Sequence, residues 1–426
     1  MIRVLRLEDP ADRLQALALR ATAQTASEVS AAVAGIVAEV RARGDAAVRE
    51  LTERFDGPRL DSLFLEEGRW NALADACPAP VIEALNLARE RVPKFHVRQI
   101  PDSYELDLEH GGRVRCLTIP LQRAACYVPG GRAAYPSTVI MTAAVARLAG
   151  VPEIIVATPP RRDGTILPEV AAAARIAGAT RILLAGGAQA VAALALGTAT
   201  IPRVDVIVGP GNAYVTEAKK QLSGEVRIDS LAGPTEVVIV ADSSAEPGQV
   251  AADLVAQAEH DPLALSVLVT PDPSLAQRTV EALQVELAEH PNRIAAESLP
   301  AHGAAVVAGD LEDALAFAND LAPEHLELLL REPQSALPKV PRAAAVFVGH
   351  HAPVPVGDYL AGPNHTLPTS GTARFASPLT AADFVRRQNV IEYGPAQLAA
   401  DRSAIESLAR AEGLHGHARA VEVRRK

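Results

Sequence analysis

The chain has 426 residues, of which 41 are basic and 51 acidic, giving a formal net charge of −10. At about 150 residues per domain, this length predicts two or three domains. Neither the acidic balance nor the short basic end at residues 424–426 favours binding to nucleic acid. Hydrophobic residues make up 49% of the chain and aromatic residues only 3%. Small and branched aliphatic side chains must therefore build the core, which suits buried parallel strands covered by alanine-rich helices.

The sequence predicts no targeting or membrane segment. Its first residues include Glu8, Asp9 and Asp12 and no uninterrupted apolar stretch, so no secretory signal peptide is predicted. No segment reaches the roughly 18 consecutive apolar residues that cross a bilayer. The three cysteines form no CxxC pair, which fits a reducing compartment. We expect a soluble, cytoplasmic protein with no membrane partner.

Residues 1–116 are expected to form a helical N-terminal region that ends in a hairpin. Apolar residues recur at helical spacing over residues 29–40. Gly44 permits a turn into a second helix, which ends near Asp56. The polar segment 98–115 alternates as a strand does and predicts the hairpin.

From residue 117 onward, short apolar runs alternate with alanine-rich helical stretches, a pattern typical of βαβ units and a parallel sheet. Strands are predicted at residues 154–157, 182–185, 204–208, 237–241, 265–269, 304–307, 326–330 and 344–348. Helices are predicted between most of them, at residues 170–176, 190–196, 250–258 and 275–287. We predict an α/β fold with two Rossmann-like parallel-sheet domains, at residues 117–235 and 236–378, followed by a C-terminal helical arm at 379–426.

Three glycine clusters adjoin predicted strands, at residues 127–131, 186–189 and 209–212. Doubly wound sheets bind nucleotides at the carboxyl ends of their strands. The third cluster follows a strand and opens a helix, as a pyrophosphate loop does, but Tyr214 replaces the third glycine of G-x-G-x-x-G. Any one cluster alone is as readily a tight turn. Together they favour a bound nucleotide.

Several nitrogen and oxygen donors are candidates for metal ligands. Gln257 and His260 stand three residues apart near the end of a predicted helix and share a face, although such a pair alone is more often a solvated helix end. Asp358 lies in a glycine- and proline-rich segment, and His415 and His417 lie near the C-terminus. Donors of these types without thiolates indicate zinc or a similar divalent ion.

The candidate acid–base pair is Glu324 and His325, just before a predicted strand. Neighbours in an extended segment point to opposite faces, so one of them alone would be exposed and the other packed. Beside a cofactor, the two side chains can instead share two proton transfers. Cys126 has no basic neighbour closer than Arg123, so we predict a buried, inert thiol and no covalent catalysis.

In this order and spacing, the motifs resemble the histidinol dehydrogenase family over nearly the whole chain. The matching stretches are residues 127–132, 135–138, 186–190, 209–219, 228–234, 257–262, 323–328, 357–375 and 412–417.

The resemblance implies a zinc enzyme that oxidises L-histidinol through histidinal to L-histidine with two NAD. It implies one Zn²⁺ per subunit, with Gln257, His260, Asp358 and His417 as ligands. His417 is expected from the partner subunit, so the resemblance also implies a homodimer with shared sites. His415 then has no role as a ligand.

The resemblance also implies roles for the remaining residues. His325 is implied as the base for the alcohol proton and Glu324 as the group that activates water. Thr235 stands where the family usually has Ser; its hydroxyl can keep the same hydrogen bond, and we expect a modest effect on binding. NAD contacts are implied for Tyr127, Gln189 and Asn212. Substrate contacts are implied for Thr235, Gln257, His260, His325, Asp358, His365, Glu412 and His417.

Three alternatives remain at this point. A related zinc and NAD enzyme could oxidise another small alcohol, such as a sulfonated diol, but the presence of His365 and Glu412 argues against it. A zinc hydrolase that uses Glu324 as its base would leave the nucleotide-contact residues unexplained. A non-catalytic nucleotide-binding protein would not need residues for every catalytic role.

Overall fold

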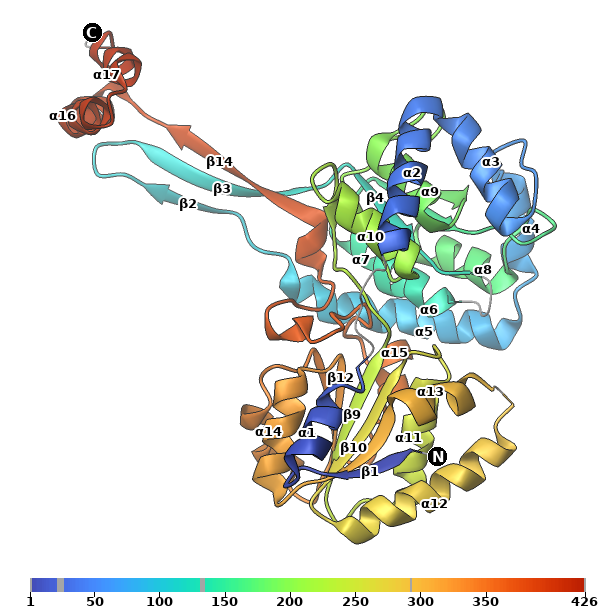
Figure 1. The fold of residues 1–426 in the computed structure, drawn as a ribbon. Coiled ribbons are helices and arrows are strands. Elements are labelled where there is room, and N and C mark those ends of the chain that lie inside the picture. Colours follow the sequence, from blue (N-terminus) through green and yellow to red (C-terminus); the bar gives the residue numbers. More distant parts are fainter. Residues whose placement is uncertain (1, 21–26, 131–134, 292, 425–426) are drawn as a thin grey trace.

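The computed structural model describes residues 2–20, 27–130, 135–291 and 293–424. Two α/β domains lie one above the other, and a long antiparallel arm projects from the region between them (Figure 1). The predicted α/β fold with two parallel sheets is confirmed.

The first domain is built on a five-stranded parallel sheet in the order β6-β5-β4-β7-β8. Counted within the domain this is the order 3-2-1-4-5 of dinucleotide-binding folds. Its strands are β4 (Arg123–Tyr127), β5 (Glu153–Thr158), β6 (Arg181–Leu184), β7 (Val206–Val208) and β8 (Arg227–Ile228). Its helices are α6 (Pro136–Val139), a π-helical turn (Ile140–Ala144), α7 (Val145–Leu148), α8 (Pro168–Ala177), α9 (Gly187–Leu196) and α10 (Ala213–Leu222).

The predicted N-terminal helices pack on this first domain (Figure 1). They are α2 (Ser27–Arg43), α3 (Asp45–Asp56), α4 (Glu67–Asp75) and α5 (Ala79–His96), followed by a 3₁₀ turn at Val97–Gln99.

The second domain is built on a six-stranded parallel sheet in the order β1-β11-β10-β9-β12-β13. When β1 is left out, β9 lies at the centre of this sheet and is the first of the remaining strands along the chain, as β4 is in the first sheet. Its strands are β1 (Arg3–Arg6), β9 (Glu236–Ala241), β10 (Leu265–Thr270), β11 (Gly303–Val307), β12 (His325–Leu329) and β13 (Ala345–Val348). Its helices are α1 (Pro10–Leu17), α11 (Pro247–Ala258), α12 (Pro273–Glu289), α13 (Ile294–His302), α14 (Leu311–Leu321) and α15 (Val354–Tyr359). Short 3₁₀ turns lie at Pro333–Ser335, Leu337–Lys339, Thr372–Arg374 and Ala381–Phe384.

Both sheets bury both of their faces, which explains the continuous apolar runs in the sequence. In β5, Ile154 and Val156 join the core on one face, and Ile155 and Ala157 join the core on the other. Every residue of β9 is buried in the same way. None of the helices in the described part of the chain is both long and apolar enough to cross a membrane.

The projecting arm consists of β2 (Tyr104–Asp107), β3 (Arg113–Pro120), β14 (Val385–Glu392), α16 (Pro395–Ala411) and α17 (His415–Glu422). Its three strands form an antiparallel sheet in the order β14-β3-β2. The predicted hairpin is therefore confirmed. The expectation of a wholly helical C-terminal segment is wrong at β14, a largely exposed strand that is held by pairing with β3.

The first residues of the chain also differ from expectation. The sequence predicts that these residues belong to the N-terminal helical region. In the structure, β1 instead pairs with β11 at the edge of the second sheet. The proposed domain boundaries at residues 116, 235 and 378 stay predictions.

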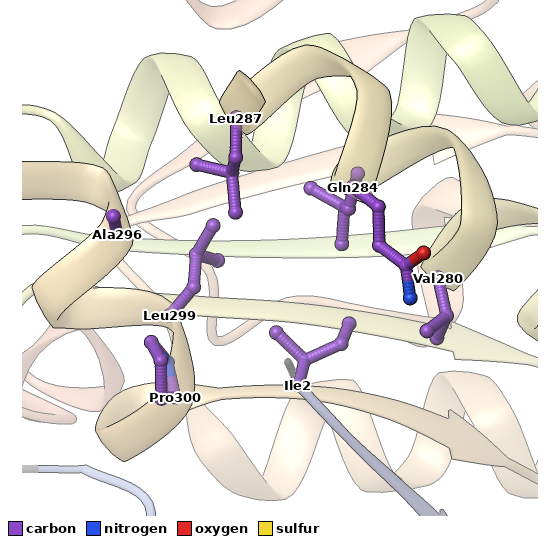
Figure 2. A pocket seen from close by; sticks show the side chains of 8 residues that line it. Ile2, Val280, Gln284, Leu287, Ala296, Leu299 and Pro300 are labelled. Carbon is purple, nitrogen blue, oxygen red and sulfur yellow. The ribbon is translucent and has the colours of Figure 1, made fainter. Parts of the chain in front are cut away.

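An apolar pocket lies in the second domain, between Ile2, α12 and α13 (Figure 2). Its volume is about 210 Å³ and its lining holds no charged side chain and no candidate site residue.

Candidate functional site

The candidate site gathers at the amino-terminal edge of the second sheet. Strands β9 and β12 are parallel neighbours, and His325 pairs in register with Val237. Thr235 directly precedes β9 and Glu324 directly precedes β12, so the shared edge brings Thr235, Glu324 and His325 together.

A chain of hydrogen bonds connects Gln257 to Glu324 through Thr235. The Glu324 Oε2 atom accepts from the Thr235 hydroxyl at 2.6 Å and from the Glu236 backbone N–H at 2.9 Å. The Gln257 side-chain amide in turn donates to Thr235 Oγ1. The hydroxyl at position 235 therefore serves as donor and acceptor at once, a role that serine or threonine can fill.

Burial makes the Glu324 carboxyl easy to protonate. Glu324 is only 7% exposed. Burial raises the pKa of its carboxyl group to about 8, although the hydrogen bonds from Thr235 and Glu236 lower this pKa. A carboxyl group with such a pKa can exchange protons near neutral pH.

His325 presents an unused ring nitrogen. Its Nδ1 donates to the Glu236 carbonyl oxygen at 2.9 Å, and because a carbonyl only accepts, Nδ1 carries the hydrogen. Its Nε2 is buried and finds no hydrogen-bond partner among the described residues. Burial lowers the pKa of the ring. His325 is therefore a neutral imidazole with a free lone pair at Nε2, as a general base requires.

Glu236, which contacts both Glu324 and His325 through its backbone, is held by a buried ion pair that the sequence did not reveal. The Arg20 guanidinium contacts the two Glu236 carboxylate oxygens at 2.7 and 2.9 Å and also donates to the Leu321 carbonyl. Since Glu236 supplies backbone contacts to both Glu324 and His325, this ion pair fixes the backbone on which the candidate acid–base pair rests.

The predicted metal ligands approach the same edge from two further elements. Gln257 lies at the end of α11 and His260 two residues beyond it, while Asp358 lies near the end of α15. The charge of Asp358 adds to the rise in the pKa of Glu324 and opposes the lowering of the pKa of His325 by burial. The structure thus brings these predicted residues into one neighbourhood.

His365 joins this group from the loop after α15. Its Nδ1 donates to the Asp358 carbonyl at 3.0 Å, and its Nε2 lies 3.3 Å from Thr138 Oγ1 in the first domain. Burial lowers the pKa of its ring, and the nearby rings of His260 and His325 add to this. His365 therefore belongs to the site and links it to the first domain.

The remaining two predicted residues lie elsewhere in the same chain. Glu412 caps α16 and His417 lies in α17, at the far end of the arm (Figure 1). Both are exposed. Within the described residues, no three His, Cys, Asp or Glu side chains are grouped closely enough to hold a metal ion.

The predicted nucleotide contacts lie at the carboxyl edge of the first sheet. Tyr127 is the last residue of β4, and its hydroxyl accepts from the Gly187 N–H at 3.0 Å. Gln189 is buried in the first turn of α9. Asn212 caps α10, because its side-chain oxygen accepts from the backbone N–H groups of Tyr214 and Val215 at 3.0 and 3.2 Å.

A buried ion pair, also missed from the sequence, shapes the third glycine cluster. The Lys219 ammonium contacts the Asp229 carboxylate at 2.7 Å and the Gly209 carbonyl at 2.5 Å, while Asp229 accepts from the Gly209 N–H at 2.7 Å. Gly209 has φ of +111°, and a Cβ there would lie 2.1 Å from the Tyr127 carbonyl. Only glycine fits this loop.

The structure agrees with the prediction that the third cysteine, Cys126, is buried and inert. Cys126 is fully buried, and burial raises the pKa of its thiol to about 12. At neutral pH such a thiol is not a nucleophile.

Comparison with known proteins identifies the family. A histidinol dehydrogenase family model matches residues 19–425. The chain belongs to the histidinol dehydrogenase family. The histidinol dehydrogenase of Parasynechococcus marenigrum (strain WH8102) is 47% identical over 412 residues, covering 96% of this chain and 94% of that protein. That of Moorella thermoacetica is 49% identical over 399 residues, 93% of this chain and 94% of that one.

The fold of the histidinol dehydrogenase family is shared as well. The crystal structure of histidinol dehydrogenase from Elizabethkingia anophelis matches with a TM-score of 0.91 at 32% identity, covering 99% of this chain and 98% of that one. The resemblance drawn from the motifs is therefore confirmed, and family membership makes the chain an oxidoreductase. The roles assigned to single residues stay predictions.

Proposed function

We propose that the chain is a cytoplasmic histidinol dehydrogenase that oxidises L-histidinol through histidinal to L-histidine, the last step of histidine biosynthesis, using zinc and two NAD. The full-length family match carries this proposal. The three cysteines, all buried and free, fit a reducing compartment.

The donor atoms near Asp358 fit a zinc ion. Because the Gln257 amide nitrogen donates to Thr235, its amide oxygen is the atom left to bind a cation. With the His260 ring and the Asp358 carboxylate it would form a nitrogen and oxygen donor set without thiolates, as in catalytic zinc sites. We propose His417 of the partner subunit as the remaining ligand. When bound, zinc would polarise and orient the substrate's hydroxyl and amine or imidazole groups.

The acid–base pair fits the two oxidations. In the first, the alcohol proton passes to His325 Nε2 as the carbon gives up a hydride and becomes an aldehyde. In the second, Glu324 takes a proton from water, whose oxygen attacks the aldehyde carbon. The hydrate then gives up the second hydride and releases its remaining hydroxyl proton to solvent, which leaves the carboxylate. When bound, NAD would supply the hydride acceptor for each oxidation. Tyr127, Gln189 and Asn212 are the proposed NAD contacts.

Substrate contacts are proposed for residues that line the same edge or reach it from the partner. His365 and Glu412 are proposed to recognise the part of L-histidinol that other small alcohols lack. The proposed substrate contacts are Thr235, Gln257, His260, His325, Asp358, His365, Glu412 and His417.

We also propose that the enzyme is a homodimer in which each arm completes the partner's site. The arm is supported by little of its own chain. Strands β2 and β14, helix α16 and the turn before α17 carry exposed apolar side chains, which mark surfaces for association. They include Tyr104, Leu106, Ile391, Leu408 and Leu414.

The first experiment measures NADH and histidine formed from limiting L-histidinol by the zinc-loaded protein. About two NADH per histidine, lost on chelation and restored by zinc, are expected for the four-electron oxidation. A folded, zinc-loaded protein that oxidises no L-histidinol but does oxidise another small alcohol would contradict the proposal. Turnover that needs zinc but no NAD would indicate a hydrolase instead.

A further inference from the structure

A buried carboxyl group and a partly exposed one lie near each other behind the candidate site. Glu327 lies on β12 two residues after His325, so both side chains leave the same face of the strand. Asp253 lies in α11 four residues before Gln257, so these two share a face of the helix. Glu327 is 0% exposed.

Glu327 also holds the start of α15. Its Oε1 atom accepts from the backbone N–H of Val354, the first residue of α15, at 2.8 Å. Asp358 follows one helical turn later. The other oxygen, Oε2, is buried and has no hydrogen-bond donor among the described N–H and hydroxyl groups. The Asp253 carboxyl lies near enough to act on the pKa of the Glu327 carboxyl, both through its charge and as a hydrogen-bonding neighbour.

Such a contact requires a proton between the two groups. Two ionised carboxylates in contact away from water repel each other, so one of them holds a proton. Burial raises the pKa of both groups, and Asp253 is partly exposed whereas Glu327 is fully buried. We therefore assign the proton to Glu327: its hydroxyl donates to Asp253, and its other oxygen accepts from Val354.

We propose that the Asp253–Glu327 pair is a positioning device that fixes α11 relative to α15, and with them the distance between Gln257 and Asp358. The inference rests on the proposed zinc site, because this distance matters only where one cation binds both residues. The pair touches no predicted ligand atom directly; it acts through two helical turns. Groups behind metal ligands commonly set ligand orientation and affinity in this way.

Substitutions at Glu327 separate positioning from simple core stability. In the Glu327→Gln variant, the amide oxygen accepts from Val354 and the amide N–H donates to Asp253, so the variant imitates the protonated acid. In the Glu327→Leu variant, both contacts are lost. Zinc affinity of the full-length chain is measured by competition with a chromophoric chelator, and thermal unfolding is measured without metal.

The matched control is Glu217→Leu, which removes a carboxyl group that is also buried, on α10 of the first domain. Both leucine variants are expected to lower the unfolding temperature. Only Glu327→Leu should weaken zinc binding, by about ten- to hundredfold, whereas Glu327→Gln should stay within about threefold of the unsubstituted protein. If Glu327→Leu does not fold, Asp253→Ala takes its place, because Asp253 is partly exposed.

The outcomes are distinguishable. Unchanged zinc affinity in folded Glu327→Leu or Asp253→Ala would overturn the positioning role and leave the zinc site standing. A Glu327→Gln variant that loses zinc as strongly as Glu327→Leu would overturn the shared-proton arrangement. Failure of the unsubstituted protein to bind zinc would overturn both this inference and the zinc-dependent function on which it rests.

Discussion

Glu324 and His325 are neighbours in the sequence, yet burial moves their pKa values in opposite directions. The pKa of Glu324 rises to about 8, while that of His325 falls. Both groups therefore tend toward their neutral forms near neutral pH, although one is an acid and the other a base. Such divergence lets two adjacent side chains serve two different proton transfers.

The first prediction concerns Glu324→Gln. Glutamine keeps an oxygen that accepts from Thr235 and Glu236 but cannot take a proton from water. We expect histidinal oxidation to fall by about 10²- to 10⁴-fold, while oxidation of L-histidinol to the aldehyde continues. Single-turnover NADH yield and aldehyde trapping with semicarbazide measure the two steps separately. Equal loss of both steps would contradict the separate role of Glu324.

The pKa of Glu324 also predicts a pH dependence. Water activation needs the ionised carboxylate, so the rate of histidinal oxidation should rise as pH increases through the pKa of Glu324. A nearby divalent cation lowers the pKa of a carboxyl group, so the midpoint is expected at or below about 8. Rates measured from about pH 6 to about pH 9 give the midpoint. A rate that falls with rising pH would show that the protonated form is the active one.

Thr235 tests the hydrogen-bonded chain between Gln257 and Glu324. Thr235→Ser keeps the hydroxyl, and we expect activity close to that of the unsubstituted enzyme. Thr235→Val keeps the shape but leaves the Glu324 oxygen and the Gln257 amide without this partner, at a cost of about 1–3 kcal/mol in stability. Chemical denaturation and steady-state kinetics of both variants give the comparison. Equal behaviour of valine and serine would show that the hydroxyl is unimportant.

At the scale of the elements, the loop between β7 and α10 is closed by a glycine and a buried ion pair. A side chain at Gly209 would meet the Tyr127 carbonyl, so Gly209→Ala must displace either the loop or β4. We expect a higher KM for NAD and a lower unfolding temperature. Gly224→Ala is the control, because a Cβ there meets nothing within 4 Å. A Gly209→Ala enzyme with unchanged KM for NAD would remove this loop from the nucleotide site.

The elements that could be predicted from the sequence are those whose burial is continuous. The run at residues 237–241 and strand β9 (Glu236–Ala241) differ by one residue, because fully buried strands show their apolar character in every position. Strand β4 (Arg123–Tyr127) also escaped prediction, although it is largely buried. Strands β1 and β14 escaped prediction because they are mostly exposed, and pairing with distant segments holds them. A single sequence does not say which distant strand supplies the partner.

The same limit decides which parts of the candidate site could be predicted from the sequence. The donor types and the Glu324–His325 pair could be taken from the sequence and from the family resemblance. The Glu236 backbone contacts, the Arg20–Glu236 ion pair and the Lys219 contact with Gly209 could not. Each of these depends on two segments lying side by side, and only the folded sheet establishes that.

At the scale of the whole molecule, the arm separates α17, the helix that contains His417, from the body of its own chain (Figure 1). Mixing inactive His417→Ala and His325→Ala subunits tests whether sites are shared. A heterodimer would rebuild one intact site from the body of the first variant and the arm of the second, so activity should return on mixing. Native mass spectrometry confirms subunit exchange. Exchange without recovered activity would contradict the shared site.

An arm that delivers a ligand across the dimer would couple two equilibria that are usually separate. Zinc held by both subunits binds the dimer more tightly than the free subunit, so zinc strengthens dimerisation and dimerisation strengthens zinc binding by the same factor. Dilution alone would then release metal, without any chelator. The zinc content of the enzyme would report its concentration as well as the metal supply of the cell.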